Sequence, residues 1–255
     1  MRELFLTDVR AHIRWIELPG EGPLRVFLHG LGCTGASDFA HIATHPALGG
    51  GPALLVDLLG FGLSDRPRDF GYGMPAQAAA VARILEHRGA AGVELIGHSM
   101  GGAVAVRLTA ARPDLIARLV VAEPNLYPGG GAFSTPVAAQ DEESFVRDGF
   151  GRMLASVDRP DYAARLRLAD PLAVHRSAVA LVEGASPSEG ELLAGLDRPR
   201  AFLVGEYSLP DADTERMRAV GVPVFEVPKA GHNLMLDNAD GFAEALARAL
   251  VVERR

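Results

Sequence analysis

Residues 94–108 read ELIGHSMGGAVAVRL: an apolar run, a serine between glycines, and a run of small residues. The first run is typical of a buried strand and the last of a helix, so the segment between them must turn sharply. Such a turn strains the backbone of its middle residue, Ser99, and requires neighbours without bulky side chains, such as Gly97 and Gly101. The pattern predicts an exposed Ser99 hydroxyl, with the backbone N–H of Met100 at the helix start directed toward whatever binds there.

A serine hydroxyl is a weak nucleophile at neutral pH, so Ser99 needs a base. His232 lies in VPKAGHNLMLDNADGF, between the last predicted strand and the last predicted helix. This loop is expected at the carboxyl end of the sheet, where Ser99 also lies, which makes His232 the candidate base. His29 and His98 lie in glycine turns and are predicted to hydrogen-bond to backbone. The other histidines carry no motif and are interpreted as surface or satisfied polar residues: His12, His41, His45, His87 and His175.

Strand and helix patterns alternate along the first half of the chain. Apolar runs at 24–30, 53–62 and 93–97 are typical of strands, and 74–87 has the spacing of a helix. From residue 124 to about 197 amphipathic patterns replace the strands, which return near the end of the chain. The alternation predicts an α/β fold with a parallel sheet covered by helices on both faces. The predicted domains are a core, 1–123 and 198–255, and an inserted helical cap, 124–197.

The chain has 255 residues, a formal net charge of −7 and one cysteine, Cys33. This charge leaves no basic surface for nucleic acid or an anionic membrane. One cysteine rules out an internal disulfide, and the histidines and carboxylates show no metal-ligand spacing. No apolar run approaches the length of a membrane span, and charged residues interrupt the first ten positions, where a signal peptide would be apolar. We therefore expect a cytoplasmic protein that acts on a small molecule without a metal or cofactor.

Four motifs in this order resemble those of the α/β-hydrolase family: HGLG from His29, DLLGFGLSDRP from Asp57, GHSMGG around Ser99 and GHNLMLDNADGF around His232. The resemblance covers nearly the whole chain. It implies an eight-stranded, mostly parallel sheet, a cap inserted after the sixth strand, and a catalytic triad of serine, acid and histidine. It also implies an oxyanion hole formed by the backbone amides of Leu31 and Met100.

The acid of the triad departs from the family pattern. After the seventh strand the family commonly has Gly-x-x-Asp, whereas this chain has GEYS, with Ser208 in the place of the aspartate. Asp211 or Asp213 in the same loop could supply the carboxylate. Glu123, at the end of LVVAE, is the preferred candidate because it directly follows a buried strand, as in some relatives of the family such as haloalkane dehalogenases. Asn125 is predicted to orient it.

With this triad, Ser99 would attack a carbonyl carbon and form an acyl-enzyme that water then releases. The sequence therefore predicts a serine hydrolase that cleaves a carboxylic ester, or a related acyl bond, of a small apolar substrate. The alternatives are a lactonase, thioesterase or carbon–carbon bond hydrolase with the same triad, and a ligand-binding sensor with little turnover. Dehalogenases and epoxide hydrolases are set aside, because they need a carboxylate where this chain has Ser99.

The residues that contact substrate are not identified by the sequence. Apolar side chains of the insertion are predicted to form mainly the core of the cap, with a pocket wall as the alternative: Leu126, Tyr127, Phe133, Phe145, Phe150 and Met153. Cys33, two residues after Leu31, is predicted to be a buried, inert thiol, with the border of the same pocket as the alternative.

Overall fold

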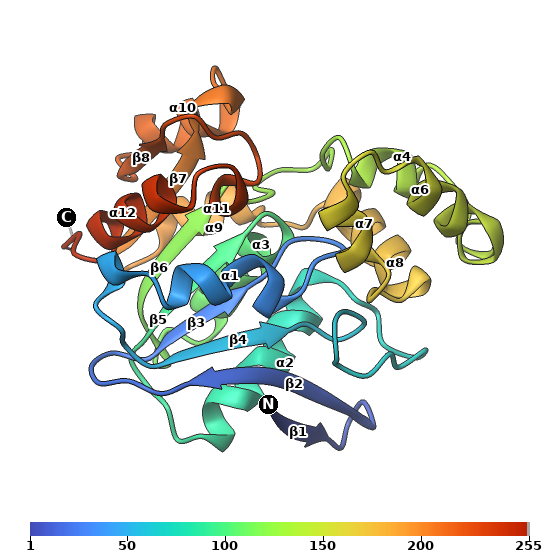
Figure 1. Ribbon diagram of the computed structural model, residues 1–255, viewed down its shortest axis with the longest axis horizontal. Helices are drawn as coiled ribbons and strands as arrows, with labels where there is room; N and C mark the ends of the chain where they lie inside the picture. Colours follow the sequence, from blue (N-terminus) through green and yellow to red (C-terminus); the bar gives the residue numbers. More distant parts are fainter. Residues whose placement is uncertain (254–255) are drawn as a thin grey trace.

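The computed structural model describes residues 1–253, which form one eight-stranded sheet flanked by helices (Figure 1). The strand order is β1-β2-β4-β3-β5-β6-β7-β8. The β1–β2 and β2–β4 pairs are antiparallel and the remaining pairs are parallel, which confirms the predicted fold class. The strands are β1 (Arg2–Leu6), β2 (Ala11–Leu18), β3 (Arg25–Leu28), β4 (Ala53–Asp57), β5 (Val93–His98), β6 (Ile116–Ala122), β7 (Arg200–Gly205) and β8 (Val224–Val227).

Helices cover both faces of the sheet, so its central strands are apolar along most of their length. Successive side chains of a strand point to opposite faces. Phe27 and Ile96 therefore pack in one apolar cluster with α1 (Gly35–Ala43), α11 (Leu234–Asp237) and α12 (Ala239–Ala249). Val26 and Leu95 pack in the other cluster, with α2 (Met74–His87) and α3 (Met100–Ala111). Among the helices of residues 1–253, none combines the length and the apolar character needed to cross a bilayer.

The chain between β6 and β7 forms a helical insertion. Its elements are α4 (Ser134–Ala138), α5 (Glu142–Ser144), a π-helical segment (Phe145–Gly149), α6 (Phe150–Ser156), α7 (Pro160–Leu166), α8 (Pro171–Glu183) and α9 (Glu189–Gly195). Figure 1 shows α4, α6, α7 and α8 gathered beyond one end of the sheet, whereas α9 packs against α3. The helical insertion is as expected, and its bounds of 124–197 stay a prediction.

The parallel strands place three side chains at one edge of the sheet. β5, β6 and β8 all run in the same direction and end at His98, Ala122 and Val227. Ser99 and Glu123 directly follow the first two ends, and His232 lies in the loop after the third. Residues that are far apart in the chain thereby meet at the carboxyl ends of the strands, which is where open α/β sheets hold their ligands.

Candidate active site

Ser99 occupies a sharp turn between β5 and α3. Its backbone has φ 52° and ψ −121°, a conformation that residues other than glycine rarely adopt. The strand and helix approach so closely that a Cβ at Gly97 would lie 2.3 Å from the Gly101 carbonyl oxygen. The Ser99 N–H donates to the Ala122 carbonyl of β6 at 3.0 Å. The turn is therefore tied to the neighbouring strand, and the strained serine is held in one place.

His232 joins Ser99 to a carboxylate. Its Nε2 lies 3.1 Å from Ser99 Oγ, and its Nδ1 lies 2.8 Å from Glu123 Oε2. An ionised carboxylate can only accept, so Nδ1–H donates to Glu123 and Nε2 remains free to accept the Ser99 proton. The imidazole is half-exposed, while the Glu123 side chain is largely buried. This arrangement is that of a nucleophile, a base and an orienting acid.

Glu123 is held by several donors at the end of β6. Its N–H donates to the Leu203 carbonyl of β7, and its Oε1 accepts from the Gly205 N–H at 2.9 Å. Burial acts to raise the pKa of Glu123, but hydrogen bonds from His232, Ser208 and Gly205 outweigh it and leave the pKa below its ordinary value. Glu123 is therefore ionised at neutral pH, as the partner of a histidine base must be.

The two alternative acids have other partners. Asp211 is the N-cap of α10 (Ala212–Ala219), where its Oδ2 accepts from the Thr214 N–H and hydroxyl, both at 2.7 Å. Asp213 pairs with Arg216 at 3.0 Å. Asp211 and Asp213 both border a hollow next to His232, yet within residues 1–253 neither is hydrogen-bonded to it. The structure thus brings Ser99, His232 and Glu123 together and leaves Asp211 at a helix start, which is a favoured position for aspartate.

Asn125 has a different neighbour from the one expected. Its Oδ1 lies 3.5 Å from Ser99 Oγ, whereas in the described part of the chain it has no hydrogen bond to Glu123. Ser99 has one hydroxyl proton and two acceptors, and the shorter 3.1 Å contact to His232 is the stronger. Ser208, rather than Asn125, bonds to Glu123 in addition to His232 and the Gly205 N–H. It stands where the family pattern has its aspartate, and its place in that motif is the signal that could have identified this contact.

Two backbone amides near Ser99, those of Leu31 and Met100, are the ones that the sequence predicts for an oxyanion hole. Met100 is the first residue of α3, and amides at a helix start have no partner within the helix. Leu31 follows β3 and borders the same cavity as Ser99. Within residues 1–253 neither the Leu31 amide nor the Met100 amide has a hydrogen-bond acceptor. Both amides are therefore available to a ligand.

His29 and His98 both hydrogen-bond to backbone groups, as the sequence predicts. His29 Nδ1 donates to the Gly30 carbonyl at 2.8 Å, while its Nε2 accepts from the Leu58 N–H. His98 Nε2 donates to the His232 carbonyl at 2.8 Å. Burial, with a further contribution from His232, lowers the pKa of His98 to about 3, so its ring stays neutral. One histidine thus fixes the Leu31 loop and the other fixes the His232 loop.

A cavity of about 170 Å³ lies between Ser99 and the insertion. Core and insertion both line it: Gly30, Leu31, Cys33, His98, Ser99, Phe133, Arg159, Tyr162, His232 and Asn233. Cys33 is buried, and burial raises the pKa of its thiol well above the usual value, which agrees with the predicted inert thiol. Of the six apolar residues singled out in the insertion, Phe133 borders this cavity, while Phe145 and Phe150 pack on each other. Leu126 and Tyr127 line the other hollow that His232 borders, together with Asp211 and Asp213.

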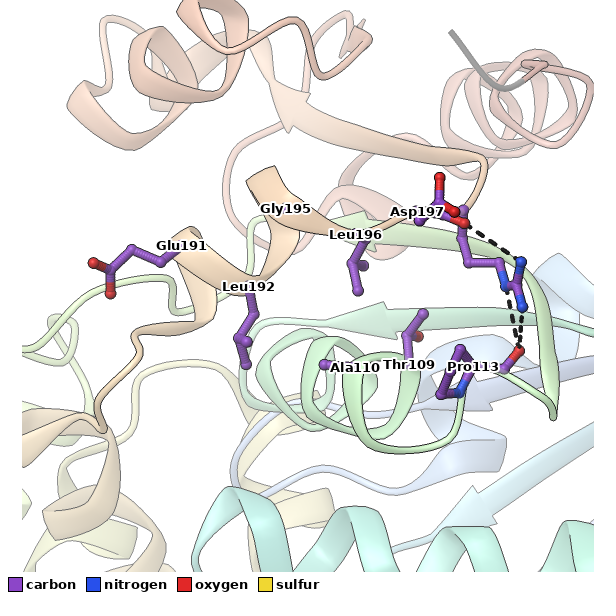
Figure 2. A pocket seen from close by; sticks show the side chains of 9 residues that line it. Thr109, Ala110, Pro113, Glu191, Leu192, Gly195, Leu196 and Asp197 are labelled. Atoms are coloured by element: carbon purple, nitrogen blue, oxygen red, sulfur yellow. Dashed lines mark hydrogen bonds between the residues drawn. The ribbon is translucent and has the colours of Figure 1, made fainter.

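Larger hollows lie away from Ser99. One of about 540 Å³ runs between α2 and α3, and one of about 400 Å³ lies between α3 and α9 (Figure 2). Thr109 and Pro113 line the second, where Arg198 donates to the Pro113 carbonyl. Neither hollow is lined by Ser99, His232 or Glu123.

Comparisons with known proteins give a family and a fold. Residues 26–245 match the model of the alpha/beta hydrolase family. The lipase LipV of Mycobacterium tuberculosis is 39% identical over 111 residues, which are 44% of this chain and 36% of the lipase. The esterase Rv0045c of the same organism is 31% identical over 176 residues, 68% of this chain and 53% of the esterase. These matches therefore span only about a third to a half of the relatives' length.

Among solved structures, a thermophilic esterase from Thermogutta terrifontis is similar to this chain with a TM-score of 0.82. The similarity covers 98% of both chains at 20% sequence identity. At that identity the similarity shows a shared fold. Because it covers nearly the whole chain, the shared fold includes the insertion as well as the sheet.

Proposed function

Since the chain belongs to the alpha/beta hydrolase family, we propose that it is a serine hydrolase that cleaves carboxylic esters with a short apolar acyl group. One observation carries the proposal: an unbroken chain of hydrogen bonds runs from Ser99 through His232 to Glu123, beside a cavity. The related lipase and esterase support ester chemistry.

In the proposed acylation, His232 Nε2 takes the proton of Ser99 while Oγ forms a bond to the ester carbonyl carbon. The π electron pair of the carbonyl moves onto its oxygen, where the Leu31 and Met100 amides stabilise the negative charge. Glu123 holds the imidazole in the tautomer with a proton on Nδ1 and stabilises the imidazolium. The carbon–oxygen bond to the alcohol then breaks, and His232 gives the proton to the leaving oxygen.

Deacylation repeats these steps with water as the nucleophile. His232 removes a proton from water as its oxygen attacks the acyl carbon, and the same two amides hold the second oxyanion. The bond to Ser99 Oγ breaks, and Oγ takes the proton back from His232. The acid product leaves and the triad returns to its starting state.

The size and lining of the cavity support a short, apolar acyl group. Its volume of about 170 Å³ is below the range of roughly 300–1,000 Å³ common for ligand pockets. Leu31, Phe133 and Tyr162 supply apolar wall, and the one formally charged lining side chain, Arg159, is paired with Asp161 at 3.2 Å. Acetyl to butyryl groups fit this description better than long acyl chains.

Hydrolysis of p-nitrophenyl esters from acetate to laurate tests the proposal. We expect the wild type to prefer the short esters, and Ser99→Ala to lose on the order of 10³-fold or more in kcat. A fluorophosphonate probe should label the wild type stoichiometrically and leave Ser99→Ala unlabelled. Ser156→Ala, which removes an exposed hydroxyl of the insertion, is the matched control and should behave as wild type. Ligand binding without labelling or turnover would favour a sensor instead.

A further inference from the structure

Tyr162 of the insertion contacts the loop that carries the Leu31 amide. It lies on α7, borders the same cavity as Ser99, and donates its hydroxyl to the Leu31 carbonyl at 3.2 Å. Burial raises the pKa of the Tyr162 hydroxyl well above its usual value, so the group remains a donor over the whole working pH range. Phe133 packs edge-on against its ring at 5.4 Å and limits its rotation.

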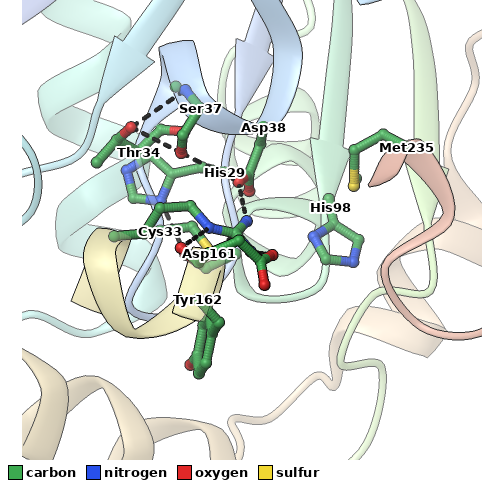
Figure 3. A network of polar contacts seen from close by, with 12 residues as sticks. His29, Cys33, Thr34, Ser37, Asp38, His98, Asp161, Tyr162 and Met235 are labelled. Atoms are coloured by element: carbon green, nitrogen blue, oxygen red, sulfur yellow. Dashed lines mark hydrogen bonds and ion pairs between the residues drawn. The ribbon is translucent and has the colours of Figure 1, made fainter. Parts of the chain in front are cut away.

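Buried charges hold α7 against α1. Arg165 pairs with Asp38 at 2.7 Å, and the two side chains are 8% and 1% exposed. Arg165 also pairs with Asp161 at 2.9 Å, and its guanidinium lies over the Tyr162 ring at 5.5 Å. In Figure 3, Asp161 and Tyr162 lie on one helix, opposite Thr34 and Asp38 of the core. An unpaired charge at this depth is costly, so the ion pair favours one docking position of α7.

The loop that carries the Leu31 amide, residues 30–33, is in direct contact with α7. Gly32 has φ 74°, and a Cβ there would lie 2.8 Å from Leu166 Cδ1 and 3.1 Å from the Tyr162 hydroxyl. A larger residue at this position would force the ends of the Leu166 and Tyr162 side chains to shift, and its own backbone would be strained at this φ. The loop therefore packs against the insertion on one side and against the core on the other.

The two peptide groups on either side of Leu31 are restrained from opposite directions. The Gly30 carbonyl, in the peptide that carries the Leu31 N–H, accepts from His29 Nδ1 and from the Cys33 N–H. The Leu31 carbonyl, in the next peptide, accepts from Tyr162. With both peptides fixed, the N–H has one direction before substrate arrives, which is the condition for efficient stabilisation of a developing charge.

From these contacts we propose that Tyr162 is a positioning residue, through which the insertion sets the direction of the oxyanion-binding amide of Leu31. The inference rests on the proposed function of Ser99 and deepens it. It makes the insertion part of the catalytic apparatus as well as a wall of the cavity: a substrate that displaces α7 weakens the oxyanion hole at the same time.

Tyr162→Phe keeps the ring and removes only the hydroxyl. Removing an oxyanion donor outright costs roughly 10²–10³-fold in kcat, so a donor that has lost its support should cost about tenfold. We expect kcat for p-nitrophenyl butyrate to fall by that factor with KM within about twofold, and labelling of Ser99 by the fluorophosphonate to slow in parallel. The melting temperature, followed by circular dichroism, serves to show that the variant is folded.

Tyr207→Phe is the matched control, because Tyr207 is exposed and removal of its hydroxyl should change neither rate. A wild-type kcat and labelling rate in Tyr162→Phe would overturn the positioning role and leave the esterase proposal standing. A raised KM with unchanged kcat and labelling rate would also overturn it, since that result describes a residue that only binds substrate. Failure of wild-type Ser99 to react with the probe would overturn both proposals.

Discussion

Strands β6 and β7 are neighbours in the sheet, but the residues that follow them differ in what they offer to His232. Glu123 comes directly after β6, and its carboxylate accepts from His232 and from Gly205. The loop after β7 contains Asp211, whose carboxylate caps α10. The strand fixes the position of a carboxylate that directly follows it. A carboxylate further along a loop can instead hydrogen-bond to a nearby unpaired backbone N–H. Distance from the strand thus decides which acid meets the histidine.

The largest expected effect on activity distinguishes the carboxylate that follows β6 from the carboxylate in the loop after β7. Glu123→Gln should lower kcat on p-nitrophenyl butyrate by roughly 10³–10⁴-fold, because an amide no longer holds the His232 tautomer or stabilises its charge. Asp211→Asn, which makes the same chemical change in the other loop, should stay within about twofold of wild type, since asparagine also caps helices well. A loss in Asp211→Asn of the size expected for Glu123→Gln would move the acid to the loop after β7.

A smaller effect is expected when the acid is moved between the loops. Ser208 stands close enough to Glu123 to bond to its carboxylate. Glu123→Gly, which fits the backbone φ of 41° without strain, should be nearly inactive. Adding Ser208→Asp to that variant should recover roughly tenfold or more in kcat, by restoring a carboxylate partner for His232. If the double variant is no faster than Glu123→Gly, the loop after β7 cannot aim an acid in this chain.

The smallest effect concerns pH and the Ser208 hydrogen bond. The pKa of Glu123 is lowered from its ordinary 4.5, so its ionised form stabilises the fold above that pH, and this stabilisation is lost as the pH falls through the lowered pKa. Ser208→Ala removes one donor and should reduce the free energy of unfolding at pH 7 by about 1 kcal/mol. In urea titrations this difference should shrink as the pH falls below the ordinary value of 4.5. A difference that is independent of pH would mean that Ser208 acts through packing.

The sequence could predict that Ser99 and His232 lie together, because each is in a short motif next to a strand end. The elbow around Ser99 needs only a strand, a glycine-flanked turn and a helix in succession, all of which are local patterns. Glu123 is harder to predict because it lies in no such motif, and only its place directly after a strand end favours it over Asp211. The sheet and the helical insertion followed from the alternation of patterns, as the structure confirms.

The contacts that surround these residues could not be predicted. Tyr162 and Leu31 are 131 positions apart, and Arg165 and Asp38 are 127 apart. The helical spacing of the insertion indicates an apolar face but not which part of the core that face covers. The β1–β2 hairpin lies outside the apolar runs taken as strands in the sequence, although β2 alternates between buried and half-buried positions, which is typical of a strand with one covered face.

The backbone at Ser99 and Glu123 has a practical consequence for directed evolution. Both residues have positive φ, at 52° and 41°, and such conformations cost roughly 1–3 kcal/mol each for residues that carry a Cβ. Glycine adopts them freely. A library selected for heat resistance alone would therefore enrich glycine at both positions and discard the proposed nucleophile and its proposed acid together. Thermostable descendants of this chain that still turn over substrate require an activity screen in every round.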